Sequence, residues 1–105
     1  MRTLLRVVLD VNASNRAIRD GSLPKIIKAT TDRIKPEASY FTTIDGCRAC
    51  YMIFDMKDPS EIPSIAEPFF MQLNARVDFS PVMNGQELQK GLEAWMKTNT
   101  AELVA

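Results

Sequence analysis

The stretch that decides the fold is EASYFTTIDGCRACYMIFDM, residues 37–56. Two strand-like runs, 37–43 and 48–56, flank Asp45-Gly46, and Asp-Gly between such runs is a strong signal for a tight β-hairpin. In the second run, alternate residues from Cys50 to Met56 are apolar, whereas the other parity is mixed. We therefore predict two antiparallel strands with one apolar face.

The residues before this hairpin predict a strand and then a helical region. Residues 4–11 form a run rich in β-branched residues, in which every second residue from Leu5 to Val11 is apolar. This is the pattern of a strand with one buried face. Apolar residues then recur at helical spacing as far as Ile34. Gly21 interrupts this pattern, and Ser22 is a candidate cap for the second part. The candidate residues for the first helix start are Asn12, Ser14 and Asn15. We expect a helix that is broken near Gly21.

The residues after the hairpin predict a second helix and a fourth strand. Asp58, Pro59 and Glu61 have the spacing of a capping box with proline in the first turn. The apolar stripe that follows is Ile62, Ile65, Ala66, Phe69, Phe70 and Leu73. Residues 75–82 alternate again, and Pro81 favours an edge position because proline cannot donate to a neighbouring strand.

A third helix is expected at about residues 85–97. Asn84 and Glu87 form a second capping box. The apolar stripe of this helix is Leu88, Leu92, Trp95 and Met96. Trp95 has two interpretations at this point: it anchors an interface between subunits, or it packs on the edge of its own domain.

This order of elements predicts one α+β domain over residues 1–105, with a core in 1–83 and the C-terminal helix outside it. Right-handed crossovers place both core helices on one face of a four-stranded antiparallel sheet. The result is the ferredoxin-like βαββαβ arrangement with strand order four, one, three, two. The residues expected on the helix-covered face are Leu5, Val7, Leu9, Met52, Phe54, Val77 and Phe79.

The order of elements and the segment Phe54-Asp55-Met56, followed by Asp58-Pro59, resemble the dimeric α+β barrel superfamily. The resemblance implies that two open sheets pair across a two-fold axis, so that the protein is a homodimer or a dimer of dimers. An independent reason is the exposed apolar patch expected on the sheet face without helices, the uncovered face. Its expected members are Leu4, Val8, Tyr51, Ile53 and Val82.

The uncovered face also carries the candidate ligand-binding residues, which are Arg6, Tyr40, Tyr51, Asp55, Arg76 and Asp78. Asp10 and Thr42 are expected beside them. An arginine there can bind a carboxylate or enolate, a tyrosine can orient a ring or hydroxyl, and Asp55 can act as a base if it is desolvated. The structural alternative is that Arg6 pairs with Asp55 or Asp78 across the strands.

Composition excludes several classes of function. Thirteen basic and thirteen acidic residues cancel, which disfavours nucleic acid and membrane surfaces as partners. The chain has no histidine, so histidine catalysis and histidine ligation of zinc or haem are impossible. Cys47 and Cys50 lie three apart in an extended strand and are interpreted as incidental, so we expect no metal or cofactor. Without a long apolar run or a signal-peptide pattern, we expect a cytoplasmic protein.

Three functions remain open. The first is a homodimer that binds a small organic ligand in the barrel interior. The second, implied by the resemblance, is a cofactor-independent monooxygenase, isomerase or lyase. The third is a structural or protein-interaction module whose uncovered face is consumed by dimerisation. An interior cavity of a few hundred Å³, roughly the usual size of a ligand site, favours the first two.

Overall fold

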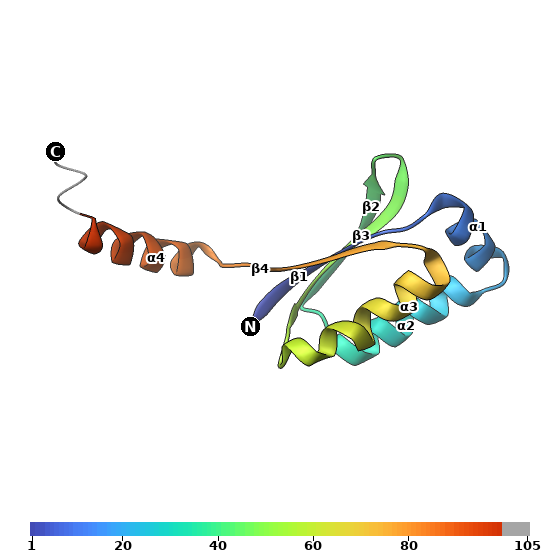
Figure 1. The fold of residues 1–105 in the computed structure, drawn as a ribbon, viewed down its shortest axis with the longest axis horizontal. Helices are drawn as coiled ribbons and strands as arrows, with labels where there is room; N and C mark the ends of the chain where they lie inside the picture. Colours follow the sequence, from blue (N-terminus) through green and yellow to red (C-terminus); the bar gives the residue numbers. More distant parts are fainter. Residues whose placement is uncertain (100–105) are drawn as a thin grey trace.

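The structure, a computed structural model, describes residues 1–99 and builds an α+β domain from which the last helix extends (Figure 1). The strands are β1 (Arg2–Val8), β2 (Ala38–Ile44), β3 (Cys47–Asp55) and β4 (Arg76–Pro81). The helices are α1 (Val11–Arg19), α2 (Ser22–Ile34), the 3₁₀ turn η1 (Pro59–Glu61), α3 (Ile62–Leu73) and α4 (Gly85–Thr98).

The four strands form one antiparallel sheet in the order β2-β3-β1-β4. The strand order predicted from the sequence, with the fourth strand at an edge, is therefore confirmed. Ile44 pairs with Cys47, so Asp45 and Gly46 alone make the turn between β2 and β3. Both have positive φ, 52° and 75°, as the tight hairpin turn that suits twisted strands requires.

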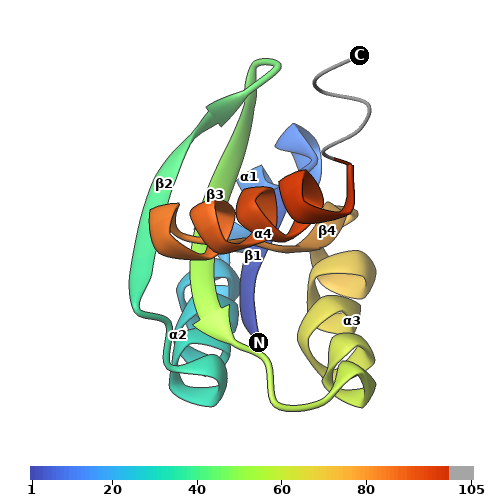
Figure 2. The ribbon, with the colours of Figure 1, turned by 90° about the vertical axis from the view of Figure 1, so that its left-hand side faces the viewer.

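Helices α1, α2 and α3 lie on one side of the sheet and enclose the core with it (Figures 1 and 2). All seven residues predicted on the helix-covered face belong to this core or pack against it. The stripe of α3 is confirmed except at Phe70, which is 43% exposed while its neighbour Phe69 is 1% exposed. Successive helical residues are rotated by about 100°, which places Phe70 beyond the edge of the buried face that Phe69 occupies.

The first strand and the first helix begin earlier than the sequence predicted. β1 spans Arg2–Val8, and the Asp10 carboxylate accepts a hydrogen bond from the Ala13 backbone nitrogen at 2.8 Å, so Asp10 is the cap of α1. The expected helix starts at Asn12, Ser14 and Asn15 are therefore wrong. Asp10 is also not a strand residue of the uncovered face, because capping a helix N–H ends the strand before it.

The break in the helical region is confirmed, although Ser22 is not the cap. Gly21 precedes α2 with φ of 81°, and Ser22 is the first helical residue. The backbone nitrogen of Ser22 donates to the Asp20 carboxylate at 2.8 Å. A left-handed backbone costs glycine little, so Gly21 lets the chain change direction between α1 and α2.

Both predicted capping boxes are present, at Asp58–Glu61 and at Asn84–Glu87. The first one differs in detail from the prediction, because the turn that it caps is the 3₁₀ segment η1, and the α-helix follows at Ile62. Pro63 lies near the start of α3, where an N–H has no partner within the helix. Pro68 lies inside the helix, where its ring removes a backbone donor.

Helix α4 projects away from the rest of the molecule (Figure 1). The molecule measures 62 by 29 by 20 Å, with a radius of gyration of 18.0 Å, against about 13 Å for a compact chain of 100 residues. Trp95 is 50% exposed, and α4 buries none of its residues within the described part of the chain. The interpretation that Trp95 packs on its own domain is therefore wrong.

Candidate functional site

The centre of the uncovered face is a row of four candidate residues across the whole sheet. Tyr40 on β2 pairs with Tyr51 on β3, Tyr51 pairs with Arg6 on β1, and Arg6 pairs with Asp78 on β4. Paired residues of antiparallel strands share a face. The structure therefore brings together four of the six residues predicted for a ligand site, and we call them the central row.

Arg6 makes the cross-strand pair that the structural alternative expected with Asp78. Its Nη1 lies 3.3 Å from Asp78 Oδ2, and the two side chains are 34% and 63% exposed. An ion pair this exposed contributes at most about 1 kcal/mol. The guanidinium has five N–H groups, so one long bond leaves it able to bind a further anion.

Asp55 lies apart from the central row. It pairs with Arg2 at the end of the sheet, and its carboxylate binds the amino group of Met1 at 2.6 Å and the ammonium group of Lys57. Hydrogen bonds from Lys57 and from the amino terminus lower the pKa of Asp55 to about 2. The side chain of Asp55 is exposed and not desolvated, and a lowered pKa makes a carboxylate a weaker base, so the role of base proposed for Asp55 has no support here.

Arg76 occupies the row next to the centre, where it pairs with Val8. Both residues line a hollow of about 280 Å³ at the end of the sheet, together with Asp10. Asp10 thus lies near the predicted site as a helix cap. Among residues 1–99, no ion pair is formed by Arg76, so its charge remains available to an anion.

The apolar part of the uncovered face is smaller than predicted. Leu4, Tyr51, Ile53 and Val82 are half-buried, but Val8 is only 2% exposed. Val8 lies between Ala49 and Arg76 in the sheet, next to the point where the chain turns into α1. Leu4 also has strand neighbours on both sides, Ile53 and Ser80, so the deeper burial of Val8 goes with its position next to the start of α1.

The two cysteines lie on opposite faces of β3, as their spacing predicted. Cys50 pairs with Val7 in the core, and burial raises the pKa of its thiol to about 11. Cys47 pairs with Ile44 and is half-buried. No group of three or more Cys, Asp or Glu side chains within residues 1–99 is suited to hold a metal ion.

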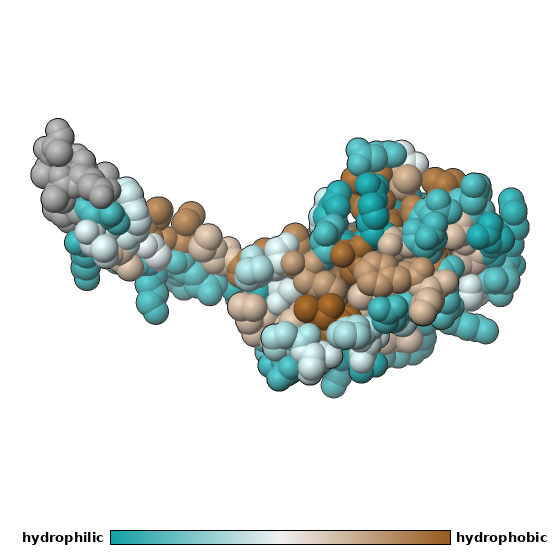
Figure 3. All heavy atoms as spheres, viewed as in Figure 1, coloured by the Kyte–Doolittle hydropathy of each residue, from teal (hydrophilic) through white to brown (hydrophobic). Residues whose placement is uncertain are grey.

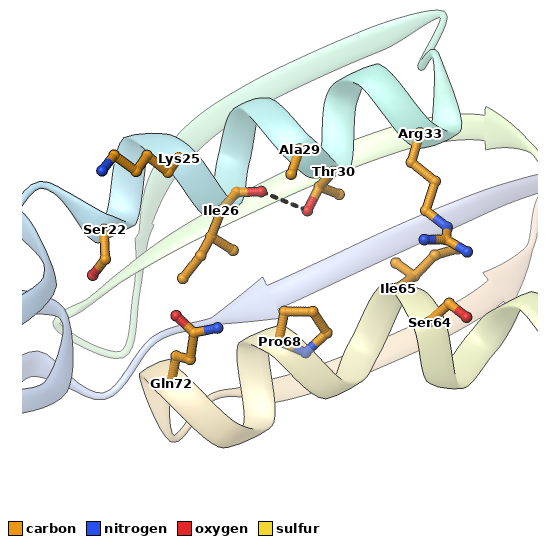
Figure 4. A pocket seen from close by; sticks show the side chains of 10 residues that line it. All are labelled: Ser22, Lys25, Ile26, Ala29, Thr30, Arg33, Ser64, Ile65, Pro68 and Gln72. Carbon is orange, nitrogen blue, oxygen red and sulfur yellow. Dashed lines mark hydrogen bonds between the residues drawn. The ribbon is translucent and has the colours of Figure 1, made fainter.

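Sequence reasoning missed two hollows on the helix-covered side. One is a groove of about 360 Å³ between α2 and α3, where the Thr30 hydroxyl donates to the Ile26 carbonyl oxygen at 2.8 Å (Figure 4). Polar side chains such as Lys25, Arg33 and Gln72 surround it. Pro68 of α3 also lines the groove, and a proline inside a helical pattern is the one sequence signal near it.

The second, which we call the apolar hollow, measures about 190 Å³ and lies beside β2. The residues that line it are Leu9, Leu23, Ile27, Phe41, Thr42, Arg48, Ala49, Cys50 and Phe69. Phe41 pairs with the core residue Cys50 but is 60% exposed. The sequence signal for such a hollow is Phe41, an aromatic residue on an edge strand whose side chain lies on the same face as the helices.

No family model matches the chain, and no curated protein sequence matches it significantly. Within residues 1–99, no helix has the length and apolar character needed to cross a membrane. Function is therefore inferred from the geometry of the uncovered face.

Proposed function

We propose that this protein is a homodimer that binds a small organic anion between the uncovered faces of its two sheets, in the manner of a dimeric α+β barrel. The observation that carries the proposal is the central row, in which two tyrosines adjoin an incompletely neutralised arginine on a sheet face without helices. A site of this kind combines apolar walls with a few converging polar groups.

The dimer is supported by the uneven cover of the sheet. Three helices pack on one face, while Leu4 and Ile53 are paired neighbours on the other. A two-fold axis lets one patch cover the same patch of a second copy, which closes the assembly. Pairing of this kind also encloses the central row and removes it from bulk water.

An anionic ligand is supported by the charges around the central row. Arg6 has one partner at 3.3 Å, and Arg76 has no ion pair within the described residues. Desolvation in a dimer strengthens the attraction of both guanidinium groups for a carboxylate. The rings and hydroxyl groups of Tyr40 and Tyr51 suit a planar or hydroxylated ligand.

The ligand part is tested with benzoate and its neutral analogue benzamide, with affinities measured by ligand-observed NMR. We expect benzoate to bind at least tenfold more tightly than benzamide. Arg6→Gln should remove this preference, and Arg76→Gln should reduce it. Arg16→Gln, on the exposed side of α1, is the control. Equal affinities for the two probes, or an unchanged preference in Arg6→Gln, contradict the anion site.

The dimer part is tested with Leu4→Asp, which introduces a charge on the uncovered face. We expect the mass from light scattering coupled to size exclusion to fall to half, with an unchanged circular dichroism spectrum. Met71→Asp, at an 81% exposed position on α3, should leave the mass unchanged. A Leu4→Asp protein that keeps the mass of the wild type contradicts the sheet-to-sheet dimer. A dimer that binds neither probe leaves the structural module as the better interpretation.

A further inference from the structure

The apolar hollow and the apolar stripe of α4 are two complementary surfaces of one chain. The stripe consists of Leu88, Leu92, Trp95 and Met96, each about half exposed, and Figure 3 shows apolar atoms along α4 and on the main body of the molecule. An isolated helix of about 12–15 residues is only marginally stable in water. Helix α4 has 14 residues, so burial of the stripe is needed to hold it.

We propose that α4 of one copy docks on a second copy, with Trp95 in the apolar hollow beside β2. The hollow is lined almost wholly by apolar side chains and measures about 190 Å³. Sites for drug-sized ligands usually measure about 300–1,000 Å³. A volume below this range suits one large apolar side chain, and tryptophan is the residue most often found as such an anchor.

We assign the occupant to a second copy because α4 points away from the hollow of its own chain (Figure 1). β4 ends opposite Thr3, whereas the hollow lies at the Leu9 end of β1 and beside β2. β2 and β4 are the two edges of the sheet, separated by three strand spacings or about 14 Å. The hollow is also about 20 Å away along β1, and α2 and α3 occupy the helix-covered side that α4 would have to cross.

The orientation of α4 is also held at its root. Arg2 Nη1 binds Glu87 Oε1 at 2.7 Å, and the backbone nitrogen of Val82 donates to the Arg2 carbonyl oxygen at 3.2 Å. These bonds favour the direction that α4 takes, away from its own domain (Figure 1). The stripe is thereby presented to another molecule.

The charges around the two surfaces match. Arg48 lines the hollow, and its Nη1 donates to the neutral oxygens of Ser14 at 2.7 Å and Asn15 at 2.9 Å. Within residues 1–99, Arg48 has no acidic partner. On α4, helical spacing of about 100° per residue puts Glu93 beside the stripe and Lys90 opposite it. Glu93 borders the stripe on the Met96 side, so a docked α4 has a carboxylate at the rim of the contact while Lys90 faces away from it.

The proposed contact is separate from the uncovered face and does not depend on a ligand there. The hollow is lined by α2, α3 and the core-facing residue Cys50, so it lies on the helix-covered side. It remains accessible when the uncovered faces pair. The two contacts can therefore be tested independently.

Trp95 is the single tryptophan of the chain, so its fluorescence reports directly on this contact. We expect the emission of the full-length protein to shift to shorter wavelength as concentration rises, because the indole leaves water. Phe41→Asp should abolish this shift, and Trp95→Ala should weaken self-association through α4 at least tenfold, measured by analytical ultracentrifugation. Phe70→Asp is the matched control, because Phe70 is an exposed phenylalanine outside the hollow.

Other outcomes overturn the proposal. An emission maximum independent of concentration shows that Trp95 stays in water. A shift that persists in Phe41→Asp but is lost in Leu4→Asp places α4 on the uncovered face instead. A shift that Phe70→Asp abolishes as fully as Phe41→Asp removes the hollow as the specific site. Failure of the anion site leaves all of these readouts unchanged, so the two proposals fail separately.

Discussion

Helices α3 and α4 both follow a capping box, through the turn η1 in the case of α3, but they lie in different environments. They have 12 and 14 residues, and their capping boxes are Asp58–Glu61 and Asn84–Glu87. The stripe of α3 lies in the core, with Phe69 only 1% exposed. The stripe of α4 faces solvent, and Arg2–Glu87 is the one side-chain ion pair between α4 and the rest of residues 1–99. Local signals thus determine where a helix starts, and they carry no information about what covers it.

The two helices also differ in how much they contribute to the stability of the domain. Burial of large apolar side chains is the main favourable term in folding, so α3 belongs to the cooperative unit formed by the sheet and its helices. A helix that buries little adds little to that unit. We therefore expect α4 to respond to mutation and to pH largely on its own until a partner covers it.

The largest difference is expected between Phe69→Ala and Leu92→Ala, each measured by urea unfolding at a concentration where the protein is monomeric. Phe69→Ala removes a buried ring and should lower the free energy of unfolding by about 3–5 kcal/mol. Leu92→Ala changes an exposed side chain and should stay within about 0.5 kcal/mol of the wild type. Similar losses of unfolding free energy in the two variants would show that α4 belongs to the same cooperative unit as α3.

A smaller difference is expected between the two helix caps. Asp58→Ala removes the bond from the Ser60 backbone nitrogen to the Asp58 carboxylate and should cost about 1 kcal/mol of global stability. Asn84→Ala removes the equivalent bond from Glu87. It should lower helicity in residues 85–98, followed by backbone NMR shifts, while the global free energy of unfolding changes by less than about 0.5 kcal/mol. A global loss in Asn84→Ala equal to that in Asp58→Ala would contradict the independence of α4.

The smallest effect is a pH dependence confined to α4. The hydrogen bond from the Asn84 backbone nitrogen, followed by the interaction with Arg2, lowers the pKa of Glu87. A lowered folded pKa stabilises the helix above the unfolded pKa of about 4.3, and this contribution is lost as pH falls through the folded value. Helicity of α4 should therefore fall between about pH 5 and 3.

The control for this effect is Glu87→Gln. Glutamine can keep the hydrogen bond of the capping box but has no charge to lose. Its NMR shifts in residues 85–98 should show a smaller change over the same pH range. An identical acid response in the wild type and in Glu87→Gln would assign the effect to another group.

The fold was largely predictable because its strongest signals are local. Asp45-Gly46 specifies a turn with positive φ at both positions, and the alternation in 48–56 specifies which face of β3 is buried. The end of β1 was less predictable. Asp10 and Asn12 are both good caps, and the choice depends on where the partner strand ends.

The candidate site was predictable in so far as the alternation of side chains along each strand determines which face a residue lies on. Arg6, Tyr40, Tyr51 and Asp78 were predicted on one face, and the register aligns them in the central row. The distance of Asp55 from the central row was also predictable, because Asp55 lies four residues, or about 13 Å, from Tyr51 along β3. Its ion pair with the amino group of Met1 was not, because Met1 lies 54 positions away along the chain. Contacts over such distances in sequence leave no periodic pattern.

The sequence by itself determined the elements, the hairpin turn, both capping boxes and the faces of the strands, because each depends on residues within a few positions of one another. Tertiary structure alone decided the burial of Val8, the two hollows on the helix-covered side and the direction of α4. These features arise where distant segments meet, as when Arg48 reaches Ser14 across 34 positions. The free energy that stabilises these features comes from contacts between distant segments, so it cannot be inferred from any one local segment.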